Sequence, residues 1–237
     1  MWRFGWITCS AASLRLTWRW GSKTLWETRS HNVVVMQSAD FRKALRESSA
    51  TDVVSNIILS KGAKHVSAEA VQHAEASLRS KFQISEKYPL EIVVVGSAKL
   101  GFSIAEKPIA GRNPLPRYRD FDPYNSDIDL AIVCQKLYFD IWRDLSTYSH
   151  NQSPFPWDTQ LGKYALVGWL RPDHFPKLQG PLRCLRWWEL FQQLSNSTQF
   201  NRRSVRGGLY FHRDFLHQYQ QRAVVQAQKA EAAGDTF

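Results

Sequence analysis

Two aspartates near the middle of the chain, Asp127 and Asp129, stand at the start of an apolar run, residues 126–133 (SDIDLAIV). Because residues two apart in a strand project to the same face, their carboxylates would lie side by side. Two like charges so close are unfavourable without a cation between them, and carboxylate oxygens suit Mg²⁺ or Mn²⁺. The pattern predicts a divalent-metal site at the end of a buried strand. The alternative is a pair of solvated acids on an edge strand.

An earlier stretch joins a predicted strand to a glycine turn. Glu91–Val95 is a continuous run typical of a strand buried on both faces, and Gly96-Ser97 follows it. Glycine has no Cβ, so the backbone at Gly96 can approach a phosphate closely. Ser97 adds a hydroxyl donor, and a helix that begins there would favour an anion. This turn is predicted to bind phosphate, with Lys99 as an accessory contact.

Two common phosphate-binding patterns do not fit this turn. In a P-loop a lysine follows the last glycine, whereas Phe102 follows Gly101 here, so the contact to the β- and γ-phosphates is missing. The dinucleotide-binding fingerprint fails because its glycine spacing is absent.

Together, the Gly96-Ser97 turn with Gly101 and the SDIDL stretch that begins at Ser126 resemble the nucleotidyltransferase superfamily typified by DNA polymerase beta. Residues 90–145 carry the resemblance, which extends loosely over 38–220. It implies an α/β fold in which a mixed β-sheet is flanked by helices. It also implies transfer of a nucleoside monophosphate from an NTP substrate to an acceptor hydroxyl, with Mg²⁺ (or Mn²⁺) as cofactor. The acceptor is left open between an RNA end, a protein side chain, a small molecule and another nucleotide.

The resemblance assigns roles to the residues of both motifs. Asp127 and Asp129 would be catalytic and would hold the metal. The nucleotide would be bound by Gly96, Ser97, Lys99, Gly101 and Ser126.

The chain departs from the superfamily pattern first in the long interval between the two motifs. This interval carries basic and aromatic residues, namely Lys107, Arg112, Arg117, Tyr118, Arg119 and Phe121. Such residues together suit phosphate contact and base stacking. A solvated loop whose charges confer solubility is an equal alternative.

The second departure concerns the third carboxylate that the superfamily carries on a later strand. The predicted strand 205–212 contains no acid, and Asp214, just past it, is the first candidate for this catalytic role. Arginines cluster around the same strand and would neutralise phosphates of an NTP or an RNA, unless they form an ordinary basic surface: Arg202, Arg203, Arg206 and Arg213.

The missing acid leaves a second function open. A catalytically degenerate module would bind nucleotide or RNA with the same cleft, and the intact aspartate pair argues against it. Fold-level analogy adds a third hypothesis, a component of a toxin or phage-defence system.

Composition bounds the class of protein. The chain has 237 residues, a formal net charge of +10 and a pI near 9.7, which favours a polyanionic partner. Its three cysteines fit neither a disulfide framework nor a zinc pattern, so a reducing compartment, the cytoplasm, is expected. No apolar run approaches the length of a membrane span, so no membrane partner is expected. The oligomeric state is not indicated.

The elements that must position these residues are predicted from periodicity. Strands are expected at 91–95, 128–133 and 205–212, helices within 38–59, 67–82, 137–145 and 215–233, and a long loop at 104–125. Residues 1–37, rich in tryptophan and arginine, are expected to be a disordered or non-native extension, with Met36 as the natural start. Residues 38–222 would form the nucleotidyltransferase-like domain, and 223–237 a polar C-terminal helix or tail.

Overall fold

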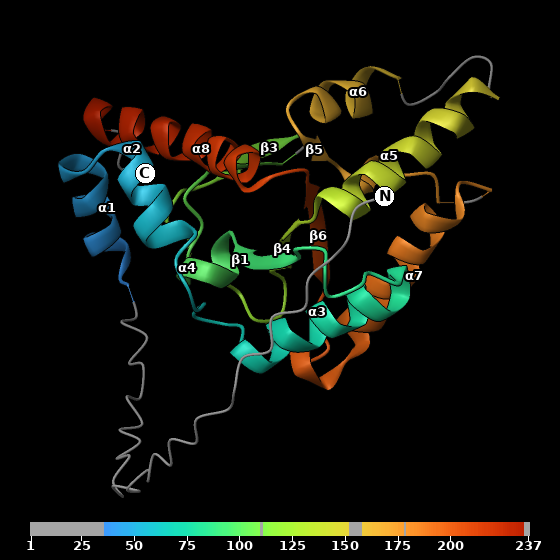
Figure 1. Cartoon of the computed structure of the whole chain (residues 1–237). Coiled ribbons are helices and arrows are strands. Elements are labelled where there is room, and N and C mark those ends of the chain that lie inside the picture. Colours follow the sequence, from blue (N-terminus) through green and yellow to red (C-terminus); the bar gives the residue numbers. More distant parts are fainter. Residues whose placement is uncertain (1–35, 110, 152–157, 178, 235–237) are drawn as a thin grey trace, which may run out of the picture. The chain divides into compact units, whose positions relative to one another are not determined.

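The computed structural model describes residues 36–109, 111–151, 158–177 and 179–234 (Figure 1). The chain divides into two units, 1–32 and 33–237, and the described residues all belong to the second. The extension predicted for 1–37 therefore lies almost wholly outside the described residues. The first helix, α1, begins at Ser38, where the folded domain was predicted to begin.

A four-stranded mixed sheet forms the centre of this unit. Its strands are β1 (Glu91–Val95), β4 (Ile128–Val133), β6 (Val205–Tyr210) and β5 (Trp169–Leu170), in the order β1-β4-β6-β5. β4 and β6 are parallel, while β1 pairs with β4 and β5 pairs with β6 in antiparallel fashion. The expected α/β class with a mixed sheet flanked by helices is confirmed. β5, only two residues long, was not predicted.

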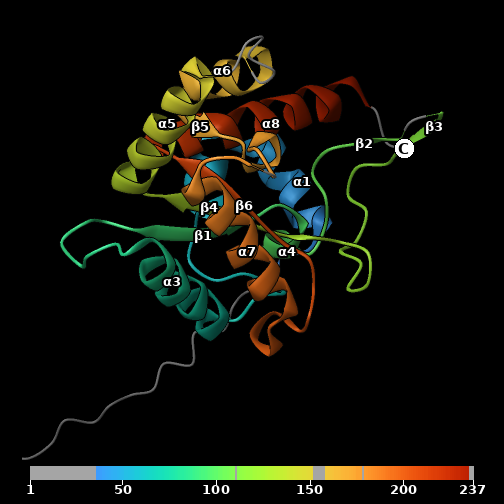
Figure 2. The same cartoon turned by 90° about the vertical axis from the view of Figure 1, so that its right-hand side faces the viewer.

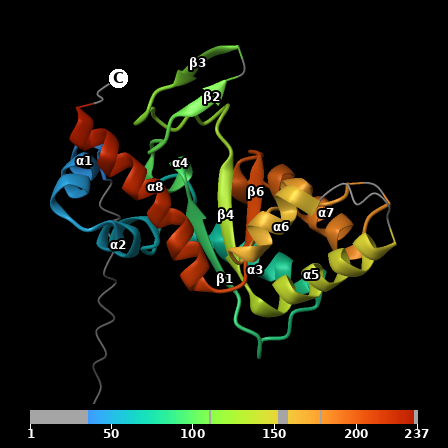
Figure 3. The ribbon, with the colours of Figure 1, turned by 90° about the horizontal axis from the view of Figure 1, so that it is seen from above.

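Helices cover both faces of the sheet. They are α1 (Ser38–Glu47), α2 (Ala50–Val53) with a π-helical turn at Val54–Ile58, α3 (Ala68–Phe82), α4 (Ser97–Leu100), α5 (Gln135–His150), α6 (Asp158–Leu166), α7 (Leu182–Asn196) and α8 (Arg213–Ala233). Figure 3 shows α1, α2 and α8 on one side of the sheet and α5 and α7 on the other. Within these described elements, no helix is both long and apolar enough to cross a bilayer.

Strand alternation sorts the core into two clusters. Ile128, Leu130 and Ile132 point into the cluster formed with α3, α5 and α7. Ala131, between them, points with Tyr210 into the cluster formed with α1, α2 and α8. By the same alternation Asp129 lies on the α8 side, beyond the apolar part of β4.

Two of the helix starts are capped by serine side chains. Ser67 Oγ accepts a hydrogen bond of 3.2 Å from Ala70 N–H at the start of α3, as the sequence predicts. At α2 the cap is Ser49, which accepts from Asp52 N–H at 3.1 Å. The sequence predicts Thr51 or Asp52 as the cap of this helix, which is wrong because the helix begins earlier, at Ala50.

The long loop predicted at 104–125 contains a small hairpin. β2 (Lys107–Ile109) pairs antiparallel with β3 (Arg112–Leu115) as a separate two-stranded sheet. Gly111, with φ +70°, lies in the turn between them. Figures 2 and 3 show the hairpin set apart from the central sheet.

α8 is continuous to Ala233 and ends at Gly234 in the left-handed conformation. Val224, Ala227 and Ala230 on its second half are buried, so residues 223–233 pack as part of the domain. The predicted boundary between 222 and 223 is therefore not present. Cys134 and Cys184 are free and buried, while Cys9 lies outside the described residues.

Candidate functional site

The turn after β1 and the start of β4 meet at one point of the sheet. Val95 is the register partner of Asp129, so Gly96 begins its turn beside that carboxylate. Gly96 has φ +70°, and a Cβ built on it would lie 3.1 Å from Asp129 Oδ2. Only glycine combines this backbone conformation with so close an approach. The structure thus brings the Gly-Ser turn and the acidic pair together.

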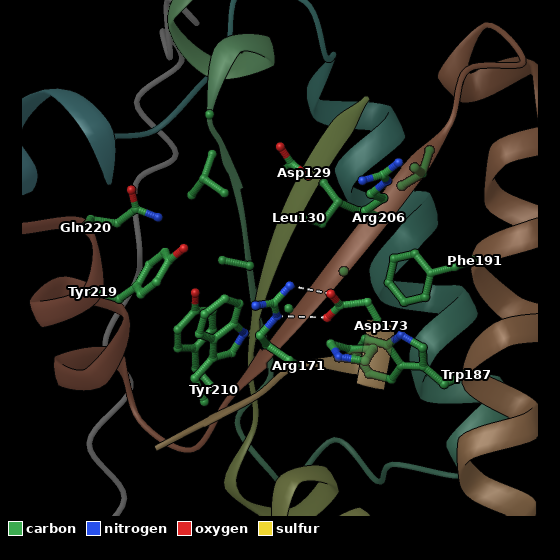
Figure 4. A pocket seen from close by; sticks show the side chains of 18 of the residues that line it. Asp129, Leu130, Arg171, Asp173, Trp187, Phe191, Arg206, Tyr210, Tyr219 and Gln220 are labelled. Carbon is green, nitrogen blue, oxygen red and sulfur yellow. Dashed lines mark hydrogen bonds and ion pairs between the residues drawn. The ribbon is translucent and has the colours of Figure 1, made fainter. Parts of the chain in front are cut away.

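The neighbouring strand β6 places an arginine beside the two aspartates. Arg206 is the parallel register partner of Asp129, and its Nη2 lies 3.0 Å from Asp127 Oδ2. Figure 4 shows Asp129 and Arg206 at the same end of a pocket. The resemblance implies a third carboxylate on a later strand, and on β6 the side chain beside Asp129 is instead a cation.

The two carboxylates differ in their surroundings. Burial raises the pKa of Asp129 to about 6, the negative charge of Asp127 adds to the rise, and the charges of Arg206 and Lys107 oppose it. A pKa raised by a like charge is the expected behaviour of two carboxylates that lack a full complement of cations.

Asp127 and Asp129 are the residues that would hold a divalent cation. Within the described ranges, no group of three or more His, Cys, Asp or Glu side chains is arranged to hold a metal ion. Arg206 supplies a positive charge at the β6 position beside Asp129. The site thus departs from the one that the resemblance implies, with two carboxylates and a cation in place of three carboxylates.

A pocket of about 670 Å³, here called the main pocket, extends from this end of the sheet around the edge of β6 (Figure 4). Gly96, Asp129 and Arg206 belong to its lining. Its aromatic lining comes from β5, β6, α7 and α8, namely Trp169, Tyr210, Trp187, Trp188, Phe191 and Tyr219. The volume is in the range usual for small-molecule sites.

The pocket exists because β6 is glycine-rich and only partly paired along this edge. β5 pairs only with Leu209 and Tyr210 of β6. The outer edge of β6 is therefore unpaired along the residues that precede Leu209. A Cβ on Gly207 would lie 2.2 Å from Phe191 Cζ, and one on Gly208 would lie 2.9 Å from Trp169 Nε1. The two glycines let aromatic rings approach the strand on both faces.

The charged side chains of the pocket are mixed in sign. Arg171 donates to Asp173, with Nε 3.0 Å from Oδ1, and lies 5.5 Å from the ring centroid of Trp169. Figure 4 shows this ion pair in the middle of the pocket. Lys177 Nζ lies 5.0 Å from the ring centroid of Trp188, and no ion pair joins it to a carboxylate of the described residues. The lining thus carries three cations, including Arg206, against two carboxylates.

Two indole N–H groups of the pocket lining are buried without an acceptor. They are Trp169 Nε1 and Trp188 Nε1, and neither has a hydrogen-bond partner in the described part of the chain. An indole nitrogen can only donate, and a buried donor without a partner costs free energy. Both nitrogens are covered by protein atoms, and Trp169 Nε1 lies against Gly208 of β6.

The structure does not bring Lys99 to this site. Its Nζ donates to the carbonyl oxygens of Ser60, at 2.6 Å, and of Gly62, and burial lowers its pKa. Gly101 ends α4 with φ +93°, and a Cβ there would lie 2.3 Å from Cδ of Lys64. Both residues hold α4 against the preceding segment, outside the pocket lining.

Ser97 and Ser126 lie next to the site residues in the chain. Ser97 is the first residue of α4. Ser126 Oγ accepts from Asp122 N–H at 3.1 Å and closes the turn before Asp127. The Ser126 hydroxyl therefore contacts and caps this turn.

Asp214 lies at the other end of β6. β4 and β6 run parallel, with Asp129 beside Arg206 at their starts, whereas Asp214 follows the last residue of β6 in the first turn of α8. Its side chain is 79% exposed and lies 3.2 Å from His212 Nδ1. The structure therefore separates Asp214 from the aspartate pair that it was predicted to complete.

The basic and aromatic residues of the long interval mostly serve packing. Tyr118 donates to Glu231 at 2.8 Å, and Arg117 pairs with Glu106 at 3.2 Å. Phe121 is buried against the ring of His65. These contacts favour a structural role for the three residues over base stacking.

Scans of the chain against protein-family models, curated proteins and solved structures each found no match. The case for a function therefore rests on the site. Sequence reasoning missed Trp169, Arg171 and Trp188 as site residues. The Gly207-Gly208 pair inside a predicted strand was the available signal, since glycine in a strand often marks a close approach of another group.

Proposed function

We propose that the protein binds a nucleoside phosphate in the main pocket. The observation that carries the proposal is that six aromatic side chains and three cations line the same pocket of about 670 Å³. Aromatic rings suit a nucleobase, and cations suit its phosphates. The resemblance to nucleotidyltransferases, carried by the Gly96 turn beside Asp129, supports a nucleotide over other polar ligands.

The two parts of a nucleotide match two parts of the lining. Trp169 and Tyr210 are stacked on each other, with ring centroids 5.8 Å apart and planes 3° from parallel, and a base would extend such a stack. Arg206 and Lys177 would meet the phosphates, since both are cations of the same lining. The proposal assigns no step to a metal.

Calorimetric titration of the full chain with each of the four NTPs, in EDTA and in Mg²⁺, tests this function. At least one NTP should bind with a Kd below about 1 mM, and EDTA should not abolish the binding. Trp188→Phe replaces an indole of the lining by a smaller ring, so it should weaken binding about three- to tenfold through lost contact with the ligand. Trp142→Phe, on an exposed tryptophan of α5, is the matched control and should leave the Kd unchanged.

Absence of binding by all four NTPs would overturn the proposal. Equal effects of the Trp188 and Trp142 substitutions would overturn the role given to the Trp188 ring.

A second candidate function is transfer of a nucleoside monophosphate to an acceptor hydroxyl on RNA or protein. One observation favours it: Gly96 lies directly against Asp129, as the resemblance implies for an active transferase. Incubation with α-labelled NTPs, Mg²⁺ or Mn²⁺ and total RNA tests it. Label transferred by the wild type and lost in the Asp127→Ala/Asp129→Ala variant would establish transfer, and the labelled species would identify the acceptor class.

A further inference from the structure

A second hollow adjoins the aspartate pair on the side away from the main pocket's aromatic lining. It has a volume of about 350 Å³ and is called the rim pocket here. Residues 123–127, before β4, and residues 201–204, before β6, form its two sides. Asp127 belongs to its lining, and Arg206, which pairs with Asp127 at 3.0 Å, belongs to the main pocket. One ion pair thus links the two hollows.

One side of the rim pocket presents an uncovered aromatic ring. Tyr124 is 93% exposed, although hydrogen bonds hold the backbone of its loop. Asp122 Oδ1 accepts from the backbone N–H of Tyr124 at 2.8 Å and of Asn125 at 3.2 Å, and Asp122 O accepts from Ser126 N–H at 2.9 Å. The loop therefore fixes the backbone of Tyr124, and its ring projects into water.

The other side presents two arginines on a tight turn. Arg202 N–H donates to Ser197 O at 3.0 Å, and Arg203 N–H donates to Phe200 O at 3.1 Å. Asn201 and Arg202 both adopt positive φ, 53° and 54°, which is uncommon for residues other than glycine. These backbone hydrogen bonds hold the turn that carries the adjacent cations Arg202 and Arg203.

Neither arginine has its charge matched within the described part of the chain. No ion pair joins Arg202 or Arg203 to a carboxylate there, and the nearby Asp127 is paired with Arg206. Arg203 instead lies 5.4 Å from the ring centroid of Phe121. The rim pocket therefore combines unmatched positive charge with an exposed aromatic face.

This combination selects one class of partner. Single-stranded nucleic acids bind where cations track the phosphates and an aromatic ring accepts a base by stacking. A duplex keeps its base faces covered, and an acidic peptide would use the arginines but not the ring. We propose that the rim pocket binds a single-stranded nucleic acid, with one base stacked on Tyr124 and adjacent phosphates on Arg202 and Arg203. This site goes beyond the nucleotide bound in the main pocket and does not require it.

Fluorescence anisotropy of a labelled twelve-nucleotide single-stranded RNA with the full chain tests the proposal. Tyr124→Ala should weaken binding about tenfold, since stacking of one base contributes substantially to affinity, whereas Tyr124→Phe should bind like the wild type. Arg202→Gln/Arg203→Gln should weaken binding and lower the slope of log K against log salt by about 1.4, or about 0.7 for each lost phosphate contact. An RNA duplex of the same length should bind more weakly.

The matched control is Lys87→Gln/Arg143→Gln, which removes two exposed charges at the opposite end of the sheet. This control variant should keep the affinity and the salt slope of the wild type, unlike the Arg202→Gln/Arg203→Gln variant. Equal losses in the two double variants would overturn the proposal in favour of general attraction to a basic chain. Equal binding by Tyr124→Ala and wild type, with full competition by a polyglutamate peptide, would overturn it in favour of an acidic protein partner.

NTP titrations of the same variants separate the two proposals. The rim variants should bind NTP in the main pocket like the wild type, and Trp188→Phe should bind RNA like the wild type. Loss of NTP binding in the rim variants would overturn the assignment of two separate sites.

Discussion

Arg206 decides what the aspartate pair can do. Its guanidinium lies 3.0 Å from Asp127 Oδ2 and occupies the β6 position beside Asp129. A positive side chain there neutralises part of the charge that a divalent cation would otherwise neutralise. We therefore expect Arg206 to favour anionic groups over a metal at this site, and a single substitution should reverse this preference.

Arg206→Asp should create a three-carboxylate set that gains Mn²⁺ binding. The expected gain in affinity over the wild type is on the order of tenfold or more, because the change removes a cation and adds a third oxygen ligand. Mn²⁺ binding can be measured by electron paramagnetic resonance. Arg222→Asp makes the same change of charge at an exposed position of α8 outside both pockets and is the control. Wild-type protein that binds Mn²⁺ as tightly as Arg206→Asp would contradict this account.

Asp129 should make the stability of the protein depend on pH near neutrality. Burial raises its pKa from 3.8 to about 6, so the folded state holds this proton more tightly than the unfolded chain does. That contribution is complete below about pH 4 and is lost as the pH rises through 6. Asp129→Asn should therefore gain stability over the wild type, by about 2–3 kcal/mol between pH 4 and pH 7. Urea unfolding at both pH values measures the difference, and a difference that does not change with pH would refute the assignment.

At the scale of elements, the glycines of β6 let α7 and β5 close around the main pocket. A Cβ on Gly207 would lie 2.2 Å from Phe191 Cζ. Gly207 is on β6 and Phe191 is on α7, so relieving the clash requires a shift of a packed strand or helix. Gly207→Ala should lower the free energy of unfolding by about 1–3 kcal/mol, the usual cost of overpacking. Chemical denaturation measures it. Combining it with Phe191→Leu, which shortens the opposing side chain, should cost less than the two single changes together, and strict additivity would show that the two do not meet.

The elements that could be predicted from sequence are those whose signal is local. The β-branched runs of β1 and β4 and the cap at Ser67 depend on neighbours in the chain, and the structure has them at the predicted places. The two-residue β5 and the hairpin around Gly111 carry too few residues to show a period. The predicted third acid, Asp214, failed for a different reason: which residue of β6 stands beside Asp129 is a matter of register between distant strands.

The main pocket was unpredictable for a related reason. Trp169 and Arg171 lie in β5 and directly after it, whereas Trp188 belongs to α7, and these two segments line one pocket where β5 stops short of the start of β6. Their spacing in the sequence carries no period that links them. The aspartate pair was visible because both acids are on one strand.

At the scale of the whole described unit, Glu231 near the end of α8 ties together segments far apart in the chain. Its side chain is only 4% exposed and pairs with Arg42 at 2.7 Å and Arg46 at 2.9 Å on α1. Tyr118, in the segment between the hairpin and β4, donates to it at 2.8 Å. α8 therefore fixes α1 and this segment to each other, although the sequence suggested only a polar helix or tail from residue 223 onward.

Glu231→Gln should lower the free energy of unfolding by about 1–3 kcal/mol, because it removes the charge that pairs with Arg42 and Arg46. The loss stays within this range because both arginines are partly exposed and would recover some hydration. Partial burial works to raise the pKa of Glu231, but the hydrogen bonds from Arg42 and Tyr118 prevail and lower it. A lowered pKa means that the carboxylate stabilises the fold above its unfolded pKa and loses this effect as the pH falls through the folded value. The difference between wild type and variant, measured by urea unfolding, should therefore be full at pH 7 and shrink below about pH 4. Glu47→Gln, on an exposed glutamate of α1, should leave stability within about 0.5 kcal/mol of the wild type. A Glu231 effect as small as that of the control would show that α8 is held by its apolar face alone.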